Sequence, residues 1–526
     1  MCELDEIIAL HRHGELEAAG LAYLSHLKKY PADANAWHMY GVLQAELGHY
    51  TDAKLSLEEA IRLNAEEPTF QLHLANVYKA MLDYPAAERL LKNMIEKFPS
   101  FAASYNNLGT VYFALQQWQE AATACQQAID HQADYVDAYF NLGLALIKLN
   151  RIEKAIVVFE ALLNLSEHHP GGLFQLGCLQ MRKHDYAKAI SYFEKLLMRF
   201  PNHAESLVNL ATCYLKLGKL AIAKQKYLEA LSLSPQDTQI LYNLGVVNMS
   251  EHRIQEAINY YLQVVAINPD DVHAQQNLGA AYLVTNDRAG ALLHFREVAR
   301  LLPQDEAIAH TIKILNGDET LSSSPPGYIQ ALFDSYADHF DEHVAGMLDY
   351  QVPQLMYDCL AAQYDLSRMK WQVLDLGCGT GLVGELFKSS AMNLTGIDLS
   401  EKMLEVAAQK GCYDALIQGD IIPYLLDHPF TYDLILAGDV VVYYGDLSSL
   451  FAAVKSALKQ GGLFVFNVEK GTDKSYVMKM GRFQHQLSYL KEIIEENGFQ
   501  VIVLNEIRIR SQNFQDVTGY LCILKR

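Results

Sequence analysis

Three glycines at alternate positions form the stretch of the chain best suited to hold a cofactor. Residues 373–381 read VLDLGCGTG, so Gly377, Gly379 and Gly381 separate a short apolar run from a helix-like run. Glycine carries no Cβ and lets the backbone approach a ligand closely. A strand, a glycine turn and a helix together make a nucleotide-cofactor site at the end of a parallel strand. Leu382 stands where a dinucleotide site has its third glycine, so the pattern is D-x-G-x-G-x-G.

Acidic residues follow the next two predicted strands. Asp398 ends a strand over residues 393–397, and Asp420 follows a strand over residues 415–418. An acid at the end of the second strand can accept two hydrogen bonds from a ribose. Further strand-like runs over residues 432–436 and 463–466 complete five elements in the order of an α/β Rossmann-like domain.

This order resembles that of class I S-adenosylmethionine (SAM) methyltransferases, whose motif I is D-x-G-x-G-x-G. The resemblance implies a methyltransferase domain over residues 328–526, with SAM as cofactor and S-adenosylhomocysteine (SAH) as product. It also implies that Asp398 binds the ribose hydroxyls and that Asp420 contacts the adenine amino group. The predicted cofactor contacts are Asp375, Gly377, Cys378, Gly379, Thr380, Gly381, Asp398, Leu399, Gly419, Asp420, Ile421 and Gly438.

The front of the chain repeats one pattern at a constant interval. A small residue recurs at that interval from Gly41 to Gly279, and an alanine and then a bulky residue usually follow it, as Ala291 and Phe295 follow Gly279. The pattern resembles the tetratricopeptide repeat (TPR), a helical hairpin of about 34 residues. We expect a multidomain chain with about nine units over residues 1–305, stacked into an all-α superhelical solenoid with a concave face.

Side-chain amides stand two positions before most of the small residues. An amide can donate and accept hydrogen bonds at once, so a regular row could pair with an extended peptide backbone. The row is similar to the asparagine ladder of O-linked N-acetylglucosamine transferases, which read peptides in this way. The alternative is that these side chains bond only within the scaffold. The predicted substrate contacts are Asn107, Asn141, Asn209, Asn243 and Asn277, with Gln175 in the same row.

An aromatic segment precedes the glycine motif, after an expected capping helix and Ser/Pro linker over residues 306–327. Phe333, Tyr336 and Phe340 follow the three-and-four spacing of a helix face within residues 328–343. The run F-D-x-Y-A-x-x-F-D resembles the amino-terminal cap of bacterial TPR-containing methyltransferases, and in related enzymes an aromatic residue closes over SAM. An aromatic face could attract a sulfonium cation, so Tyr336 and Phe340 are predicted cofactor contacts. Ordinary helix packing is the alternative.

A third group of polar residues lies near the end of the chain. The sequence G-R-F-Q-H-Q-L-S-Y resembles a signature of the same bacterial family, which extends the resemblance over essentially the whole chain. If this segment is helical, Arg482, His485 and Tyr489 share one face. His485 is the first candidate for a general base, followed by Asp439, and Tyr489 is a further catalytic candidate. Arg482 is a predicted substrate contact. The alternative is a structural hydrogen-bond cluster.

Composition limits the partners. The 526 residues carry a net charge of −20, which repels phosphate backbones and anionic lipids, so neither nucleic acid nor a membrane is an expected partner. The eight cysteines contain no C-x-x-C pair, and no zinc or other metal site is expected. Unpaired thiols, together with an amino terminus that lacks a basic n-region, favour the cytoplasm.

Three functions fit these observations. The first is a SAM-dependent methyltransferase whose acceptor, a protein or peptide by preference, is recruited by the solenoid. The second is a methyltransferase acting on a small molecule, with the repeats serving only assembly. The third is a TPR adaptor whose SAM-binding domain is not catalytic. The five intact motif residues from Asp375 to Asp398 argue against a domain that has lost SAM.

Overall fold

The structure is a computed structural model that describes residues 3–334, 337, 340–341, 349–472, 474–479, 481–512 and 515–526. Tyr336, one of the predicted cofactor contacts, lies outside the described residues. The chain divides into two compact units, residues 1–260 and 261–526, and the division falls inside one helix, α16. Within the described ranges, no helix combines the length and apolar content that a membrane span requires.

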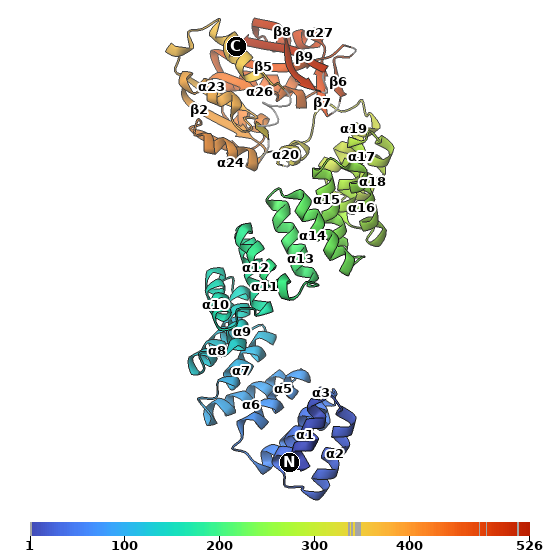
Figure 1. Ribbon diagram of the computed structural model, residues 1–526. Coiled ribbons are helices and arrows are strands. Elements are labelled where there is room, and N and C mark those ends of the chain that lie inside the picture. Colours follow the sequence, from blue (N-terminus) through green and yellow to red (C-terminus); the bar gives the residue numbers. More distant parts are fainter. Residues whose placement is uncertain are drawn as a thin grey trace. The chain divides into compact units, whose positions relative to one another are not determined.

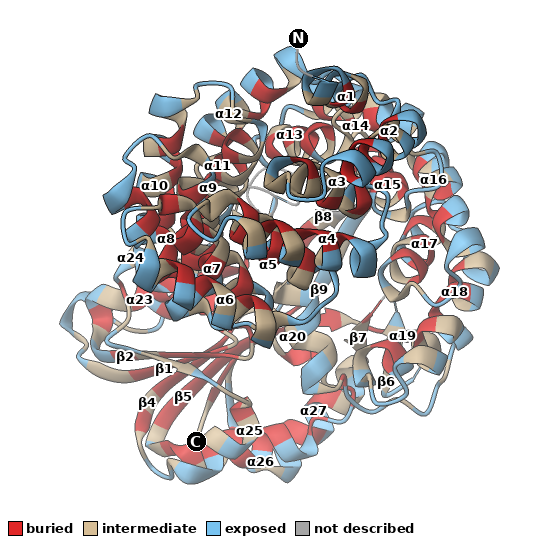
Figure 2. Cartoon of the chain, turned by 90° about the horizontal axis from the view of Figure 1, so that it is seen from below, coloured by how far each residue is buried: buried red, intermediate tan, exposed pale blue. Residues whose placement is uncertain are grey.

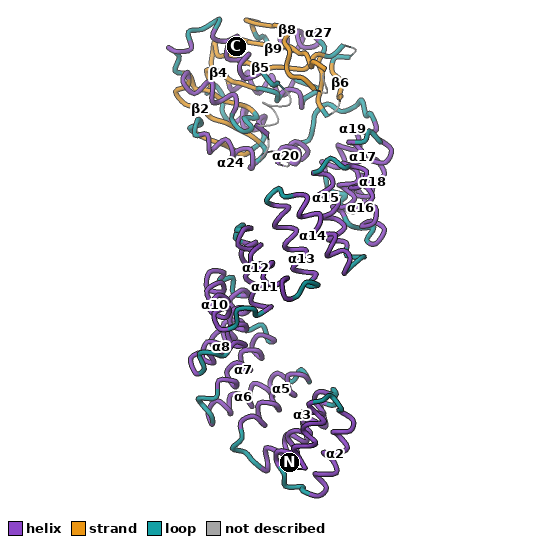
Figure 3. The backbone as a smooth tube through the Cα atoms, viewed as in Figure 1, coloured by secondary structure: helices purple, strands orange, loops and turns teal. Residues whose placement is uncertain are grey.

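Residues 3–316, all of which are described, form helices and no strands, as Figure 3 shows for the first part of the chain. The helices follow one another as antiparallel pairs (Figure 1), and the predicted all-α solenoid is confirmed. The paired helices are α1 (Glu3–Arg12), α2 (Leu16–Lys29), α3 (Ala34–Glu46), α4 (Tyr50–Leu63), α5 (Pro68–Ala80), α6 (Tyr84–Lys97), α7 (Ala102–Ala114), α8 (Trp118–His131), α9 (Val136–Lys148), α10 (Ile152–Leu165), α11 (Pro170–Arg182), α12 (Tyr186–Arg199), α13 (Ala204–Lys216), α14 (Leu220–Leu233), α15 (Thr238–Ser250), α16 (Ile254–Ile267), α17 (Val272–Val284) and α18 (Arg288–Leu301).

The small residue of each unit lies where the two helices of a hairpin touch. A Cβ added to Gly177 would lie 2.5 Å from the ring of Phe193, and one added to Gly279 would lie 2.6 Å from the ring of Phe295. In both units this ring belongs to the bulky residue that the repeat pattern pairs with the glycine. Glycine is required at these two positions because the facing aromatic ring fills the space that a side chain needs.

Each hairpin also turns through one residue with a positive φ, in the left-handed region. These residues recur with the period of the repeat, and several are not glycine although a Cβ is unfavourable there. The turn residues are Gly14, Gly48, Leu82, Gln116, Asn150, His184, Gly218, His252 and Asn286.

A nine-stranded sheet forms the centre of the second half of the chain, and the predicted α/β domain is confirmed. Strands β3, β2, β1, β4 and β5 are parallel in that spatial order, and β9 continues the sheet antiparallel to β5, with β8 outside it. A short hairpin, β6–β7, attaches to the end of β5. The strands are β1 (Trp371–Leu376), β2 (Ala391–Asp398), β3 (Ala415–Gln418), β4 (Tyr432–Ala437), β5 (Leu458–Lys470), β6 (Tyr476–Lys479), β7 (Arg482–His485), β8 (Gln500–Gln512) and β9 (Gln515–Lys525).

Helices cover both faces of this sheet, and its central strands are buried (Figure 2). Alternate residues of β1 therefore enter different cores: Leu374 packs with Phe451 on one face, and Val373 packs with Met356 on the other. Such burial on two faces is typical of parallel sheets. The helices described in this part are α22 (Val352–Ala361), α23 (Leu382–Phe387), α24 (Glu401–Lys410), α25 (Ile421–Asp427), α26 (Ser448–Ala457) and α27 (Leu487–Glu496).

The predicted cap and linker lie between the last hairpin and this sheet. Helix α19 (Glu306–Asn316) packs on α18, and α20 (Pro326–Asp334) follows the Ser/Pro stretch. The Ser324 N–H donates to the Tyr443 carbonyl at 2.9 Å, and Ser323 forms a β-bridge with Tyr444. The linker is thus bonded to η4 (Val441–Tyr443), the 3-10 turn after β4.

Candidate active site

The glycine turn begins directly after β1, and its glycines have separate roles. Gly377, Gly379 and Gly381 all have positive φ, between 53° and 93°. A Cβ on Gly377 would lie 2.5 Å from Val440, whereas a Cβ on Gly379 would meet nothing within 4 Å. Gly381 is the N-cap residue of helix α23 and faces the ring of Tyr413. Only the Gly379 position therefore leaves open space beside the backbone, as a close ligand contact needs.

Asp398 ends β2 with its carboxylate against this turn. One oxygen accepts the Gly379 N–H at 2.8 Å and the other accepts the Ser400 N–H at 2.9 Å. Burial raises the pKa of Asp398, and the backbone donors from Ser400 and Gly379 oppose that rise. The carboxylate lines a cavity, so it is placed to accept hydrogen bonds from a diol such as a ribose.

The cavity measures about 470 Å³ and lies at the carboxyl ends of the parallel strands, a size and place typical of cofactor sites. It brings together most of the residues that the sequence predicts. Those among its lining residues are Phe340, Gly377, Cys378, Gly379, Thr380, Asp398, Leu399, Asp420, Ile421, Gly438, Asp439 and Arg482.

Three predicted cofactor contacts lie beside the cavity instead of lining it. Asp375 is buried and accepts a hydrogen bond from the Tyr413 hydroxyl at 2.7 Å. Burial, more than the neighbouring Asp398 charge, raises the pKa of Asp375 to about 7. Gly381 contacts Tyr413, and Gly419 donates its N–H to the Asp398 carbonyl. These residues shape the turn and the strand ends, and the geometry does not support direct contact with a cofactor.

Aromatic and apolar side chains line the cavity on the side of α20. Tyr328, Leu332 and Phe333 come from that helix, and Phe340 lies with its ring centroid 6.2 Å from that of Phe333. The Thr380 hydroxyl donates to Asp341, which ties this segment to the glycine turn. The sequence predicts an aromatic cap over residues 328–343 that includes most of α20, but Tyr328, Leu332 and Phe333 were not among its predicted cofactor contacts.

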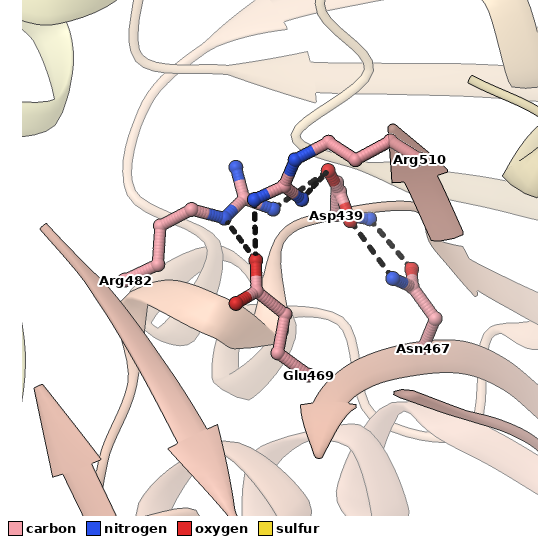
Figure 4. A network of polar contacts seen from close by, with 5 residues as sticks. All are labelled: Asp439, Asn467, Glu469, Arg482 and Arg510. Atoms are coloured by element: carbon pink, nitrogen blue, oxygen red, sulfur yellow. Dashed lines mark hydrogen bonds and ion pairs between the residues drawn. The ribbon is translucent and has the colours of Figure 1, made fainter. Parts of the chain in front are cut away.

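Five charged and polar side chains form a cluster next to the cavity (Figure 4). Arg482 donates to Asp439 at 2.6 Å and to Glu469 at 2.7 Å, and Arg510 donates to the same oxygen of Glu469 at 2.7 Å. Asn467 accepts the Asp439 N–H and donates to its carboxylate, both at 2.8 Å. These bonds hold Asp439 at a φ of 59°, a strained conformation for a residue with a side chain.

The segment that carries the predicted catalytic histidine is a strand, β7, and not a helix. The expectation that Arg482, His485 and Tyr489 share a helix face is therefore wrong, because Tyr489 belongs to the following helix, α27. The His485 ring is fully buried and does not line the cavity; its Nε2 lies 2.8 Å from the Tyr444 carbonyl and 3.2 Å from the Gly445 carbonyl. Burial lowers its pKa to about 4. The Tyr489 hydroxyl accepts the Leu447 N–H.

This geometry does not support a general-base role for His485 or a catalytic role for Tyr489. Neither lines the cavity, and each is hydrogen-bonded to backbone of the segment 444–447 that follows η4. The two side chains instead fix this segment, whose Tyr444 lines the cavity. Of the three predicted catalytic residues, only Asp439 reaches it.

The predicted asparagine row lies on the first helices of its hairpins, half-buried. Each of the five asparagines has a partner in the scaffold: Asn107 donates to Asn76, and Asn141 donates to Asn106, both at 2.9 Å. The further contacts are Asn209 to Cys178, Gln239 to Asn243, and Asn277 to Tyr261. These side chains therefore bond within the scaffold, as the alternative expected. Because they are also partly exposed, peptide binding stays a prediction.

Comparison with known families divides the chain in the same way. Residues 374–466 match the family described as "Methyltransferase domain". Three tetratricopeptide-repeat families match residues 34–67, 100–168 and 242–306, and residues 182–264 match "Anaphase-promoting complex, cyclosome, subunit 3".

Among curated relatives, the ubiquinone biosynthesis O-methyltransferase of Thiobacillus denitrificans is 30% identical over 125 residues, 23% of this chain and 53% of that protein. The malonyl-[acyl-carrier protein] O-methyltransferase of Halalkalibacterium halodurans is 32% identical over 171 residues, 31% of this chain and 61% of that protein. This chain thus spans about half the length of the curated relatives it matches. A solved structure of part of a TPR protein from Cytophaga hutchinsonii covers 46% of this chain and 99% of its own, at 16% identity and a TM-score of 0.41.

Proposed function

We propose that this chain, in which tetratricopeptide repeats precede a class I methyltransferase domain, transfers a methyl group from SAM to an acceptor brought in by the repeats. The observation that carries the proposal is the position of the Asp398 carboxylate beside the open backbone at Gly379, on the wall of one cavity. A carboxylate at this position can accept hydrogen bonds from both hydroxyls of a ribose, and a glycine lets the ligand approach the backbone closely.

The residues present fit SAM. Asp398 would hold the ribose, Asp420 and Ile421 at the end of β3 would face the adenine, and Gly377 and Gly379 would lie along the amino-acid end. Bound there, SAM supplies a methyl group on a sulfonium whose leaving group is a neutral thioether. The protein then contributes mainly by positioning the reactants. The glycine turn and Asp398 would hold SAM, and the rest of the cavity would orient the acceptor.

The acceptor side of the cavity lies along β4, β7 and α20. Asp439 and Arg482 supply polar contacts there, and Leu332 and Phe333 supply an apolar cover that excludes water. We assign His485 and Tyr489 to positioning of the 444–447 segment, and Tyr444 to the wall itself. The relatives named above are O-methyltransferases, which supports oxygen as the acceptor atom.

A protein or peptide acceptor in the concave groove of the repeats is the reading we favour. Two features support it: the partly exposed asparagine row, and the contact between α19, the helix that follows the last repeat, and the cavity wall. His310 of α19 lies edge-on against Tyr328, a lining residue, with ring centroids 4.7 Å apart. The helix that packs on the last repeat thus also contacts the cavity wall. We place this reaction in the cytoplasm.

Tritiated SAM added with the purified full chain to a lysate that lacks it tests the proposal. Label in a polypeptide band is the expected result. Label only in the small-molecule fraction would support the second candidate, an enzyme whose repeats serve assembly. If the chain binds SAH but transfers no label, the third function, a TPR adaptor with a non-catalytic SAM-binding domain, is supported. If it neither binds SAH nor transfers label, the chain is not a methyltransferase.

A further inference from the structure

The charged cluster lies on the opposite half of the sheet from the predicted cofactor contacts. Asp398 and Asp420 follow β2 and β3, whereas Asp439 follows β4, Arg482 begins β7 and Arg510 belongs to β8. In the sheet, β3 and β2 lie on one side of β1, and β4, β5, β7, β9 and β8 lie on the other. The cavity reaches both halves, so the cluster faces whatever lies beyond the ribose.

The cluster is formally neutral, with two arginines and two carboxylates, but not all of its members line the cavity. Arg482, Arg510 and Asp439 line it, but their fourth partner, Glu469, does not. Glu469 is buried behind both guanidinium groups, with a side chain only 5% exposed. The wall therefore presents two cations and one anion. Figure 4 shows the third guanidinium nitrogen of Arg482 directed away from both carboxylates.

Asp439 is poorly suited to remove a proton here. Although burial alone would raise its pKa, the charges of Arg482 and Arg510 hold the pKa of Asp439 below its ordinary value. Its carboxylate is also bonded to Asn467 and to Arg482. An ionised, fully bonded acid is a weak base, so the geometry favours a nucleophile that arrives without a proton to lose.

We infer that Arg482 and Arg510 hold a carboxylate in this cavity, and that the carboxylate belongs to the acceptor and is the group methylated. A planar guanidinium matches a carboxylate in shape and charge, and a partly desolvated pair is stronger than one in water. The inference rests on the proposed function and adds the chemical class of the acceptor. The same chemistry could also serve the amino-acid carboxylate of the cofactor, so the test must separate the two sources.

The chemistry balances without a base. A carboxylate oxygen forms a bond to the methyl carbon while the bond from that carbon to sulfur breaks, and the electron pair stays on sulfur. A sulfonium and a carboxylate become a neutral thioether and a neutral methyl ester, with no proton released. Asp439 then acts as a positioning residue that orients Arg482.

Alkali treatment of the labelled product tests the acceptor class, because carboxylate methyl esters release methanol in mild base whereas methyl ethers and methylamines do not. With the full chain, tritiated SAM and a lysate lacking the protein, we expect most of the transferred label to become volatile. We expect Arg482→Lys, which keeps the positive charge but loses the planar guanidinium with its two parallel N–H donors, to reduce methyl transfer at least tenfold. The Kd of SAH, measured by calorimetry, should change less than threefold.

Arg508→Lys is the matched control, since Arg508 lies on the same strand as Arg510 but pairs with Asp349 and Asp516 outside the cavity. It should leave transfer within twofold of wild type. Alkali-stable label from the wild-type chain would overturn the inference while leaving the proposed function intact. If Arg482→Lys weakens the binding of SAH tenfold, but not the binding of an SAH analogue that lacks the carboxylate, the arginine binds the carboxylate of the cofactor. That result would also overturn the inference. No transfer by the wild-type chain would overturn the proposed function and the inference with it.

Discussion

The solenoid and the methyltransferase domain use glycine in contrasting ways. In the solenoid, Gly177 and Gly279 perform one task, making room for an aromatic ring on the facing helix. In the turn after β1, Gly377 makes room for Val440 while Gly379 leaves space open. A task repeated along the chain is visible as a period in the sequence. A task performed once is visible only from its neighbours in the structure.

The two regions also differ in what they bury. Across residues 3–316, which are described throughout, the buried polar residues are His, Gln, Asn and Ser, and no Asp, Glu, Lys or Arg is among them. The methyltransferase domain buries Asp375, Asp398, Glu469 and Arg510. Burial of a charge is costly unless it is paired or bonded. That cost is concentrated around the cavity in which we propose that the reaction takes place.

The sharpest test of this contrast is the dependence of stability on pH. The pKa of Asp375 is raised from 3.8 to about 7, so between these values the folded domain keeps a proton that the unfolded chain has released. Asp375 therefore contributes a loss of stability as pH rises through that window, of about 1.4 kcal/mol per pH unit and about 4 kcal/mol in total. The lowered pKa of His485 has the opposite effect below pH 6.5, so the comparison with a variant isolates Asp375. Asp375→Asn, which mimics the protonated acid, should remove the Asp375 contribution, so wild type and variant should differ in slope.

Tryptophan fluorescence can report that effect for one region alone. Trp371 begins β1, and the other two tryptophans, Trp37 and Trp118, belong to the solenoid and can be replaced by phenylalanine. Urea unfolding at pH 5 and pH 8 then measures the methyltransferase domain. An equal slope with pH in wild type and Asp375→Asn would remove Asp375 as the source.

Crowding a hairpin should have the next largest effect. Gly177→Ala places a methyl group 2.5 Å from Phe193, and overpacking of this kind destabilises by about 1–3 kcal/mol. We expect loss of helical circular dichroism at lower urea, with SAH affinity unchanged. Gly20→Ala is the control, because its Cβ would meet only Leu43 at 3.6 Å and should stabilise helix α2 by about 0.5–1 kcal/mol. Equal effects of the two variants would contradict the packing account.

The matching change in the turn after β1 should affect ligand binding more than folding. Gly379→Ala meets no atom within 4 Å, but it places a side chain at a φ of 53°, which costs about 1–2 kcal/mol. Its methyl group would occupy the cavity wall, so we expect at least a tenfold loss of SAH affinity by calorimetry. Destabilisation with intact affinity would mean that this backbone does not approach a ligand.

The asparagine row should show the smallest effect on stability. Asn141→Ala removes one hydrogen bond to Asn106, worth about 0.5–1.5 kcal/mol. If the row also reads peptides, Asn141→Ala combined with Asn243→Ala should reduce label in polypeptide without changing SAH affinity. Unchanged labelling would leave these residues a purely structural role.

The sequence predicted the solenoid more completely than the methyltransferase domain, because the solenoid repeats one pattern. The period of the repeat places the paired small and bulky residues of the solenoid, and the order of short apolar runs places β1 to β5 and Asp398. It did not predict that Arg510 lines the cavity, because Arg510 and the glycine turn are far apart in the chain and come together only in the folded domain. His485 was misjudged because three-and-four spacing suggested a helix, whereas pairing with β5 and β6 makes the segment a strand.

Calorimetric titration of the full chain with SAH, wild type against Asp398→Ala, tests the central claim most directly. Asp414→Asn is the control, because Asp414 bonds to Lys388 and the Leu394 N–H away from the cavity. Loss of two charge-assisted hydrogen bonds, each worth about 1.5–3 kcal/mol, predicts at least a hundredfold weaker binding for Asp398→Ala. The wild type and the control should bind alike. No binding by the wild type, or equal affinity in Asp398→Ala, would contradict a SAM site in this cavity.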